Sequence, residues 1–200
     1  VQQAVGPSGQ YGDSIVITTA KLHRTAEKEG LRFDQTEKDY VILWVLAGLS
    51  RSGAKEHGWL FKGGTCLRHC YYTGYRFSED IDFSCNPGGD NLETSLRLLD
   101  DVAAWVLTES GVRLSILEPL TVEGDFQIEL PVEYNRGGAR RQGLPQVKVH
   151  LTFDEPILDK AVIRTVAPIY SDLLPFEVMA YSKNEIVAEK LRSLLQQQQK

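Results

Sequence analysis

The chain has 200 residues, a formal net charge of −5 and three cysteines, with 42% hydrophobic and 24% charged residues. This length is enough for one domain with a real core, and the composition is typical of globular chains. The longest apolar run, residues 40–49, is much shorter than the roughly 20 residues of a membrane helix, so we expect no membrane span. The negative charge argues against a protein that coats nucleic acid nonspecifically, but it permits a local basic groove.

The N-terminal residues lack the basic and apolar regions of a secretory signal. An odd number of cysteines without such a signal indicates reduced thiols, so we expect a cytoplasmic protein. We expect residues 1–15 to form a flexible arm and residues 16–200 to form a single domain.

The first half of the chain predicts helices separated by one short strand-like piece. Residues 18–29 read as a helix that ends at Gly30, and Asp34 with Glu37 offers a capping pair for a buried helix over 37–53. Ser182 and Glu185 form a second capping pattern before a C-terminal helix. Further expected elements are a short apolar segment at 59–64, a helix at 65–72, a strand at 81–85 and a helix at 92–110, for which Asp90 and Glu93 are capping candidates.

The middle of the chain changes its hydrophobic period. Residues 112–116, 126–130 and 147–153 alternate apolar and polar side chains, which indicates half-buried strands. A glycine-rich basic loop at 131–146 is expected to close a hairpin between the last two strands. We therefore predict an α+β fold with a mixed or antiparallel sheet flanked by helices.

Two carboxylates one residue apart form the first chemical signal. On a strand, Asp80 and Asp82 project from the same face, while Ile81 and Phe83 pack into the core. Adjacent carboxylates repel each other unless a cation lies between them, and Mg²⁺ is often held by two carboxylates together with substrate phosphates. A solvent-facing acidic strand edge is the alternative explanation for this pattern taken alone.

A glycine pair lies a short distance before these aspartates. Gly63 and Gly64 let the backbone approach a ligand closely, and Thr65 is expected at a helix N-terminus, where free N–H groups favour an anion such as a triphosphate. Lys62 could add a positive charge. A plain tight turn is the alternative for the glycines alone, but a phosphate cradle beside a metal site would form one centre, because the metal bridges phosphate oxygens.

These residues resemble the active-site signature of the AbiEii/AbiGii-type nucleotidyltransferases, toxins in the DNA-polymerase-β-like superfamily. The resemblance implies the polymerase-β-like fold, Mg²⁺ (or Mn²⁺) held by Asp80 and Asp82, an NTP substrate, an RNA acceptor such as a tRNA end, and a cognate antitoxin. It also implies that Arg76 and Ser78 organise the site. The matching residues are Gly63, Gly64, Thr65, Arg76, Phe77, Ser78, Asp80, Ile81, Asp82 and Phe83.

A second block, residues 181–195, resembles the family's later helix and places its functional lysine at Lys190. A helical projection puts Lys190 between Ile186 and Leu194, on a stripe that also holds Val187 and that we expect to face the protein. The opposite side, which we expect to face solvent, carries Glu185, Glu189, Arg192 and Gln196. An inward lysine is costly unless it meets anions, so we expect Lys190 to reach the nucleotide phosphates. A lysine at the edge of the stripe with its ammonium in water is the alternative.

The third carboxylate of such sites is not evident. Glu129 and Asp154 are candidate third ligands, whereas His150 departs from the acidic residue that many relatives carry in this strand. Relatives also continue beyond the lysine helix with a further acidic motif, so we expect this chain to be C-terminally truncated relative to the family.

Several weaker candidates remain. Cys66, His69 and Cys70 have the composition of a partial zinc site, although buried thiols are the expected alternative. Basic residues of the hairpin loop are candidates for RNA phosphate contact. The other functional hypotheses are a catalytically inactive nucleotide-binding or protein-interaction module of the same fold and a phosphohydrolase of the D-x-D type. The basic residues of the hairpin loop that are candidates for RNA contact are Arg136, Arg140, Arg141 and Lys148.

Overall fold

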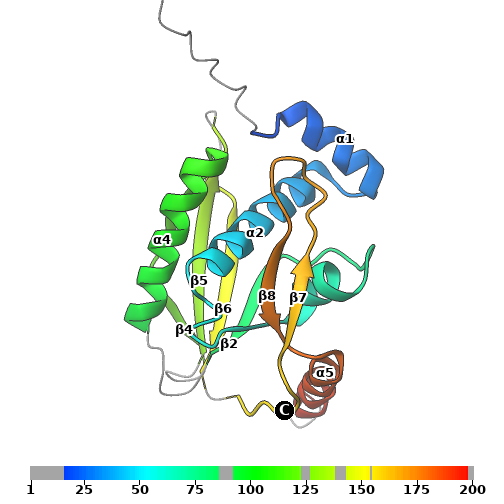
Figure 1. The fold of residues 1–200 in the computed structure, drawn as a ribbon, viewed down its shortest axis with the longest axis vertical. Coiled ribbons are helices and arrows are strands. Elements are labelled where there is room, and N and C mark those ends of the chain that lie inside the picture. Colours follow the sequence, from blue (N-terminus) through cyan, green and yellow to red (C-terminus); the bar gives the residue numbers. More distant parts are fainter. Residues whose placement is uncertain (1–15, 86–91, 123–126, 138–142, 154, 198–200) are drawn as a thin grey trace, which may run out of the picture.

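The structure, a computed structural model, describes residues 16–85, 92–122, 127–137, 143–153 and 155–197 (Figure 1). The predicted N-terminal arm and the capping candidate Asp90 lie outside these residues. Among the described helices, none is both long enough and apolar enough to cross a membrane. The elements follow one another in the order α1 (Thr19–Glu29), α2 (Phe33–Arg51), β1 (Leu60–Lys62), α3 (Gly63–Cys66), the π-helical turn η1 (Leu67–Tyr71), β2 (Asp80–Ser84), α4 (Leu92–Ser110), β3 (Arg113–Ile116), β4 (Leu120–Val122), β5 (Gln127–Asn135), β6 (Gln146–Thr152), β7 (Val162–Val166), β8 (Phe176–Ala180) and α5 (Lys183–Gln197).

The described strands form one mixed sheet, which confirms the predicted α+β class. Its strand order is β3-β5-β6-β2-β1-β8-β7, and β4 pairs with β5. The pairs β2–β6 and β1–β8 are parallel, and the other pairs are antiparallel. The predicted hairpin between β5 and β6 forms, but β5 runs on to Asn135 and β6 begins at Gln146, so both ends of the expected 131–146 loop belong to the strands. Strand β2 lies near the middle of the sheet between β1 and β6.

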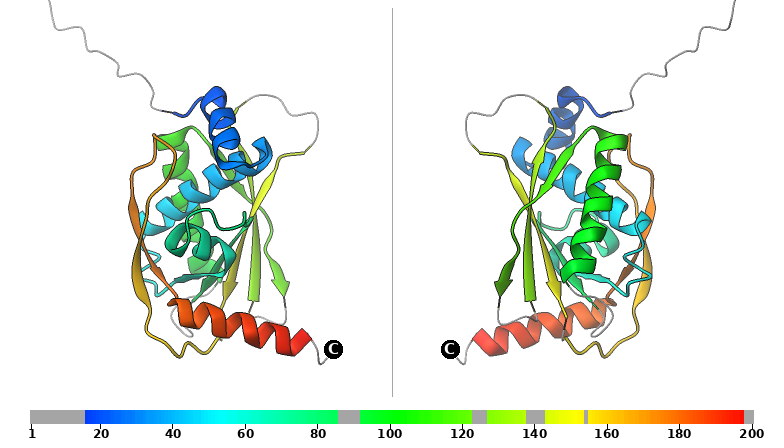
Figure 2. Two further views of the ribbon diagram at one scale, coloured as in Figure 1. Left: turned by 90° about the vertical axis from the view of Figure 1, so that its right-hand side faces the viewer. Right: turned by 90° about the vertical axis from the view of Figure 1, so that its left-hand side faces the viewer.

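Helix α2 forms the centre of the hydrophobic core. Every residue from Asp39 to Leu49 is buried, so the helix is enclosed on all sides rather than on one stripe. It lies beside α4, and the two helices approach so closely at Gly48 that an added Cβ would lie 2.7 Å from Val102 Cγ1. Helices α1 and α5 lie at opposite ends of the molecule (Figures 1 and 2). The predicted buried helix is therefore confirmed.

The helix caps agree only in part with their predictions. Gly30 ends α1 in the left-handed conformation, as predicted. The Asp34–Glu37 pair does not cap α2, because the helix already begins at Phe33 and the Arg32 N–H donates to Gln35 Oε1 at 3.1 Å. At α5, Ser182 Oγ accepts from the Glu185 N–H at 3.1 Å, which confirms half of that capping pattern.

Three strands were not expected from the alternation of side chains. These are β4, β7 and β8, and two of them continue the sheet beyond β1. Strand β8 pairs in parallel with β1 at Phe61 and Ala180. This pairing carries the chain to Tyr181, whose N–H donates to the Phe61 carbonyl at 3.0 Å, and so brings α5 close to the end of β1.

Candidate active site

Polar side chains from four neighbouring strands lie in one row across the sheet. In the register of the strands, Lys62 of β1 lies opposite Asp82 of β2. Asp82 lies opposite His150 of β6, and His150 lies opposite Glu129 of β5. Asp80 lies two residues before Asp82 and therefore on the same face of β2. The row places the two predicted metal ligands beside side chains that come from sequence positions far away.

The glycine turn meets the aspartates directly. Gly63 has a φ of +75°, a conformation that favours glycine, and a Cβ at this position would lie only 2.0 Å from Asp82 Oδ2. At Gly64, an added Cβ would lie 2.7 Å from Ser78 Oγ. The turn and the aspartates therefore belong to one centre, in which these glycines leave space that a larger residue would fill.

The side chain of Thr65 does not reach this space. It is fully buried, and its hydroxyl donates to the Asp80 carbonyl. The hydroxyl thus ties the first turn of α3 to the start of β2, which fixes the glycine turn relative to the aspartates. The prediction that Thr65 helps to hold a triphosphate therefore concerns its backbone N–H and not this hydroxyl.

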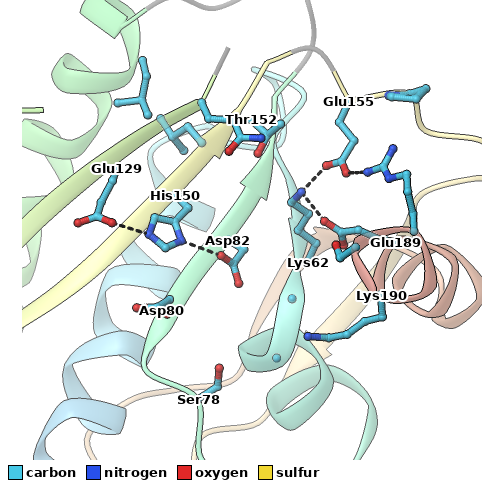
Figure 3. A pocket seen from close by; sticks show the side chains of 18 of the residues that line it. Lys62, Ser78, Asp80, Asp82, Glu129, His150, Thr152, Glu155, Glu189 and Lys190 are labelled. Atoms are coloured by element: carbon cyan, nitrogen blue, oxygen red, sulfur yellow. Dashed lines mark hydrogen bonds and ion pairs between the residues drawn. The ribbon is translucent and has the colours of Figure 1, made fainter. Parts of the chain in front are cut away.

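A cavity of about 710 Å³ opens above the row, between the sheet and α5 (Figure 3). It brings together most of the residues that the sequence singled out, from three separate stretches of the chain. Asp154 lies outside the described residues. The predicted residues that line the cavity are Lys62, Gly63, Gly64, Arg76, Ser78, Asp80, Asp82, Glu129 and Lys190.

His150 of β6 lies between Asp82 of β2 and Glu129 of β5. Its Nδ1 lies 3.0 Å from Asp82 Oδ1 and its Nε2 lies 3.1 Å from Glu129 Oε2 (Figure 3). The hydrogen bond to Asp82 is the main cause that raises the pKa of His150, and Glu129 adds to it. With a carboxylate facing each ring nitrogen, the arrangement favours the imidazolium, so a cation stands at the strand position where the resemblance led us to expect a carboxylate.

The described acidic side chains do not form a complete metal cage. No group of three or more His, Cys, Asp or Glu side chains in the described part of the chain is arranged to hold a metal ion. Glu129, a candidate third ligand, instead pairs with Lys148 Nζ at 2.9 Å as well as with His150. Asp80 and Asp82 thus remain the pair with carboxylate oxygens suited to Mg²⁺, which commonly takes its other ligands from phosphates and water.

Lys190 lines the cavity, but the predicted orientation of its helix was wrong. Val187, Leu191 and Leu194 are all more than half exposed. The helix is turned so that Ile186, at the edge of the predicted inward stripe, is buried, while Glu189 from the opposite side reaches Lys62. Lys190 itself is exposed and extends from α5 toward the cavity (Figure 3).

The ammonium of Lys62 turns toward two glutamates. It pairs with Glu155 Oε2 and with Glu189 Oε1, the latter at 2.7 Å, and the side chain is only 8% exposed. The positive charge of Lys62, which we expected to contact a phosphate, is therefore already paired within the protein.

A family model described as "Nucleotidyl transferase AbiEii toxin, Type IV TA system" matches residues 44–200, which include the glycine turn, both aspartates and Lys190. The chain belongs to the AbiEii nucleotidyltransferase toxin family. No curated protein sequence matches it significantly.

A solved structure shares the fold of this AbiEii family member. The nucleotidyltransferase toxin MenT4 from Mycobacterium tuberculosis H37Rv matches with a TM-score of 0.58 and 21% sequence identity. The match covers 88% of this chain and 58% of MenT4. The chain thus spans little more than half the length of that relative, and the likeness supports the fold alone.

Two weaker candidates outside the AbiEii signature have structural roles. Cys66 and Cys70 are buried free thiols, and His69 Nε2 lies 3.2 Å from Asp39, so they do not form the partial zinc site. Arg136 donates to the Ile17 carbonyl at 2.9 Å and its side chain is 10% exposed, so it is not available as a basic contact for RNA. Arg140 and Arg141 lie outside the described residues.

Sequence reasoning missed three charged residues of the cavity wall: Glu155, Glu189 and Arg192. Glu155 follows β6 and accepts from Ser84 Oγ at 2.8 Å as well as from Lys62 and Arg192. For Glu189 the sequence signal was weak, because a glutamate beside a lysine on a helix usually marks a solvated face. Only the ion pairs with Lys62 show that the carboxylates of Glu155 and Glu189 face the interior of the protein.

Proposed function

We propose that the chain transfers a nucleoside monophosphate from a nucleoside triphosphate to an acceptor and releases pyrophosphate. The observation that carries this proposal is the contact between the glycine turn and Asp82, where an added Cβ would lie 2.0 Å from the carboxylate. Phosphates held at this turn would lie against both aspartates. Membership of the AbiEii family supports the same reaction class.

The phosphate side of the cavity is formed by the turn and by α5. Helix α3 begins at Gly63, and the N–H groups of a first helical turn have no partner within their own helix. Gly63 and Gly64 let a phosphate approach these groups, while Lys190 and Arg76 line the same cavity and supply positive charge. Ser78, opposite Gly64, offers a hydroxyl.

Asp80 and Asp82 would hold Mg²⁺, or Mn²⁺ in its place. Burial raises the pKa of Asp80, and the neighbouring Asp82 raises it further, so a cation between them would relieve an unfavourable pair of charges. When bound, such an ion neutralises charge that develops on the transferred phosphoryl group. The carboxylate donor set fits this hard cation.

In the proposed reaction, a hydroxyl oxygen of the acceptor forms a bond to the α-phosphorus. The bond from this phosphorus to the oxygen that bridges to the β-phosphate breaks, pyrophosphate leaves with that electron pair, and the hydroxyl proton passes to solvent. His150 is poorly placed as the base, because both ring nitrogens already face carboxylates. Its role in this arrangement is to hold Asp82 and Glu129 in position.

We further propose that the acceptor is RNA, such as a tRNA end, and that the protein acts in the cytoplasm as the toxin of a toxin–antitoxin pair. The family description supports the toxin role and a cognate antitoxin. The buried free thiols are consistent with a reducing compartment.

A specific observation supports a second candidate, a nucleotide-binding module without transferase activity. His150 stands between Asp82 and Glu129 and already neutralises one predicted metal ligand. If this pairing persists with nucleotide bound, the protein would bind a triphosphate without transferring it.

The test is transfer of α-labelled ribonucleoside triphosphates, each in turn, to total RNA with Mg²⁺ or Mn²⁺. We expect labelled RNA with the unaltered protein and a loss of at least about 100-fold with Asp80→Ala or Asp82→Asn. Glu79→Gln is the matched control, because Glu79 is exposed, pairs with Lys38 and does not line the cavity. Triphosphate binding without any transfer would establish the binding module, and release of inorganic phosphate alone would indicate the phosphohydrolase.

A further inference from the structure

Helix α5 carries Lys190 but has little apolar attachment to the rest of the protein. Of its described side chains, Glu185 and Ile186 are the buried ones, while Val187, Leu191, Leu194 and Leu195 are all more than half exposed. Burial of a single isoleucine does not define where a helix of this length sits. The remaining attachment must come from polar contacts.

Three acidic or basic side chains of α5 make those contacts. Glu185 accepts from the backbone N–H groups of Leu158 and Asp159 at 3.2 and 2.7 Å. Glu189 pairs with Lys62, and Arg192 pairs with Glu155. They lie on the side of the helix that the sequence pattern assigned to solvent.

Lys62 joins these contacts to the row of polar side chains that crosses the sheet. It is the last residue of β1, immediately before Gly63, and it is paired in register with Asp82. Its ammonium lies between Glu155 and Glu189 (Figure 3). Glu155 is held in turn by Ser84 Oγ at 2.8 Å, so the cluster is anchored on the sheet.

The charges of the cluster are balanced, and its inner pair, Lys62 and Glu155, is buried, whereas the Arg192 side chain is 43% exposed. Two cations, Lys62 and Arg192, meet two carboxylates, Glu155 and Glu189, and the Glu155 and Lys62 side chains are 7% and 8% exposed. Removing Lys62 would take the inner cation from both carboxylates, which is far more costly than the loss of an exposed pair. Glu189 is the residue directly before Lys190, so its pairing fixes the backbone that carries the phosphate-facing lysine.

We propose that Lys62 is a positioning residue: by pairing with Glu155 and Glu189 it holds α5 at the cavity rim and thereby directs Lys190 toward the nucleotide phosphates. This inference rests on the proposed function, and it reassigns Lys62 from a direct phosphate contact. Lys62 acts on the nucleotide through Lys190.

The first experiment measures hydrogen exchange of the α5 amides and needs no nucleotide. Lys62→Met is expected to speed exchange over residues 186–195 by about tenfold or more, with α2 and α4 unchanged, because the buried carboxylates lose their cation. Lys62→Arg is expected to preserve protection, since its guanidinium can pair with both carboxylates. Lys38→Met, which removes a lysine paired with Glu79 outside the cavity, is the matched control. Unchanged α5 exchange in Lys62→Met would overturn the proposal.

The second experiment is a double-mutant cycle on equilibrium binding of labelled ribonucleoside triphosphate with Mg²⁺. We expect Lys62→Met and Lys190→Met each to weaken binding about tenfold, and the double variant to be no weaker than Lys190→Met alone. Additive losses would show that Lys62 contacts the nucleotide itself and would overturn the proposal. If Lys62→Met does not fold, Glu189→Gln takes its place in both experiments with the same expectations. Faster α5 exchange in a protein that binds no triphosphate would refute the proposed function but not the attachment of α5.

Discussion

Gly63 and Gly74 share a backbone conformation but have different surroundings. Their φ angles are +75° and +78°, which are costly for residues with a Cβ. A Cβ on Gly74 would have no atom within 4 Å, whereas a Cβ on Gly63 would collide with Asp82. Alanine substitutions at the two positions therefore distinguish the cost of the backbone conformation from the cost of a collision with Asp82.

We expect Gly74→Ala to lower the free energy of unfolding by about 1 kcal/mol and to leave triphosphate binding unchanged. Gly63→Ala should cost about 1–3 kcal/mol more and abolish both binding and transfer, because Asp82 must move. Chemical denaturation and nucleotide binding of the two variants provide the measurement. Equal effects on binding would contradict the proposed contact between turn and carboxylate.

At the scale of the elements, a buried aspartate joins α2 to η1 and to the segment before β8. Asp39 is 1% exposed; Arg68 Nε and His69 Nε2 lie 3.2 Å from its Oδ1, and Tyr170 donates to Oδ2 at 2.9 Å. Burial alone would raise the pKa of Asp39, but His69, Arg68 and Tyr170 outweigh it, so the pKa lies below its usual 3.8.

We expect Asp39→Asn to lower the free energy of unfolding by about 3–5 kcal/mol near neutral pH. Because the folded pKa is depressed, this contribution is complete above pH 3.8 and is lost as the pH falls through the lower folded pKa. Denaturation curves from neutral to acidic pH should therefore converge for the two proteins below pH 3.8. Asp34→Asn is the control: its ion pair with Arg32 is exposed, and we expect no measurable change. A gap that widens in acid would contradict the sign.

The orientation of α5 gives a second prediction at this scale. Ile186 is 1% exposed and its neighbour Val187 is 56% exposed. Ile186→Ala should destabilise α5 by about 2–4 kcal/mol, while Val187→Ala should cost about 0.5 kcal/mol or less. Hydrogen exchange of α5 and chemical denaturation measure both. The reverse order would restore the orientation that the sequence pattern suggested.

At the scale of the whole molecule, one cavity collects residues from β1, β2, β5, β6 and α5. A ligand that bridges these elements stabilises the folded state by mass action. At a triphosphate concentration 100-fold above its Kd, the gain is about 2.7 kcal/mol, which for a chain of this size raises Tm by roughly 5–10 °C.

We expect this increase in Tm with Mg²⁺ and the preferred triphosphate, and expect EDTA or Asp80→Asn to abolish it. Thermal unfolding with each of the four ribonucleotides measures the effect and identifies the preferred base. An increase that persists in Asp80→Asn with EDTA would show that the nucleotide binds without the predicted metal site.

Features that depend on short-range sequence patterns could be predicted for this protein. A Gly-Gly turn, alternating aspartates on a strand, a fully apolar helix at 40–49 and a glycine at a helix end all depend on neighbours within a few residues. These elements, and the expectation that the glycine turn and the aspartates form one centre, could therefore be predicted from the sequence. Lys190 was also identified as a cavity residue, although through a resemblance and with the wrong face of its helix turned inward.

The side chains that meet across the sheet and under α5 could not be predicted in this way, because they depend on strand pairing and helix docking. The parallel pairing of β2 with β6 places His150 between Asp82 and Glu129, and no local pattern encodes that register. A helical period reveals a polar and an apolar stripe on α5 but not which one docks. The polar stripe docks here because Lys62 and Glu155 supply buried partners for Glu189 and Arg192, and such partners come from residues more than 30 positions away.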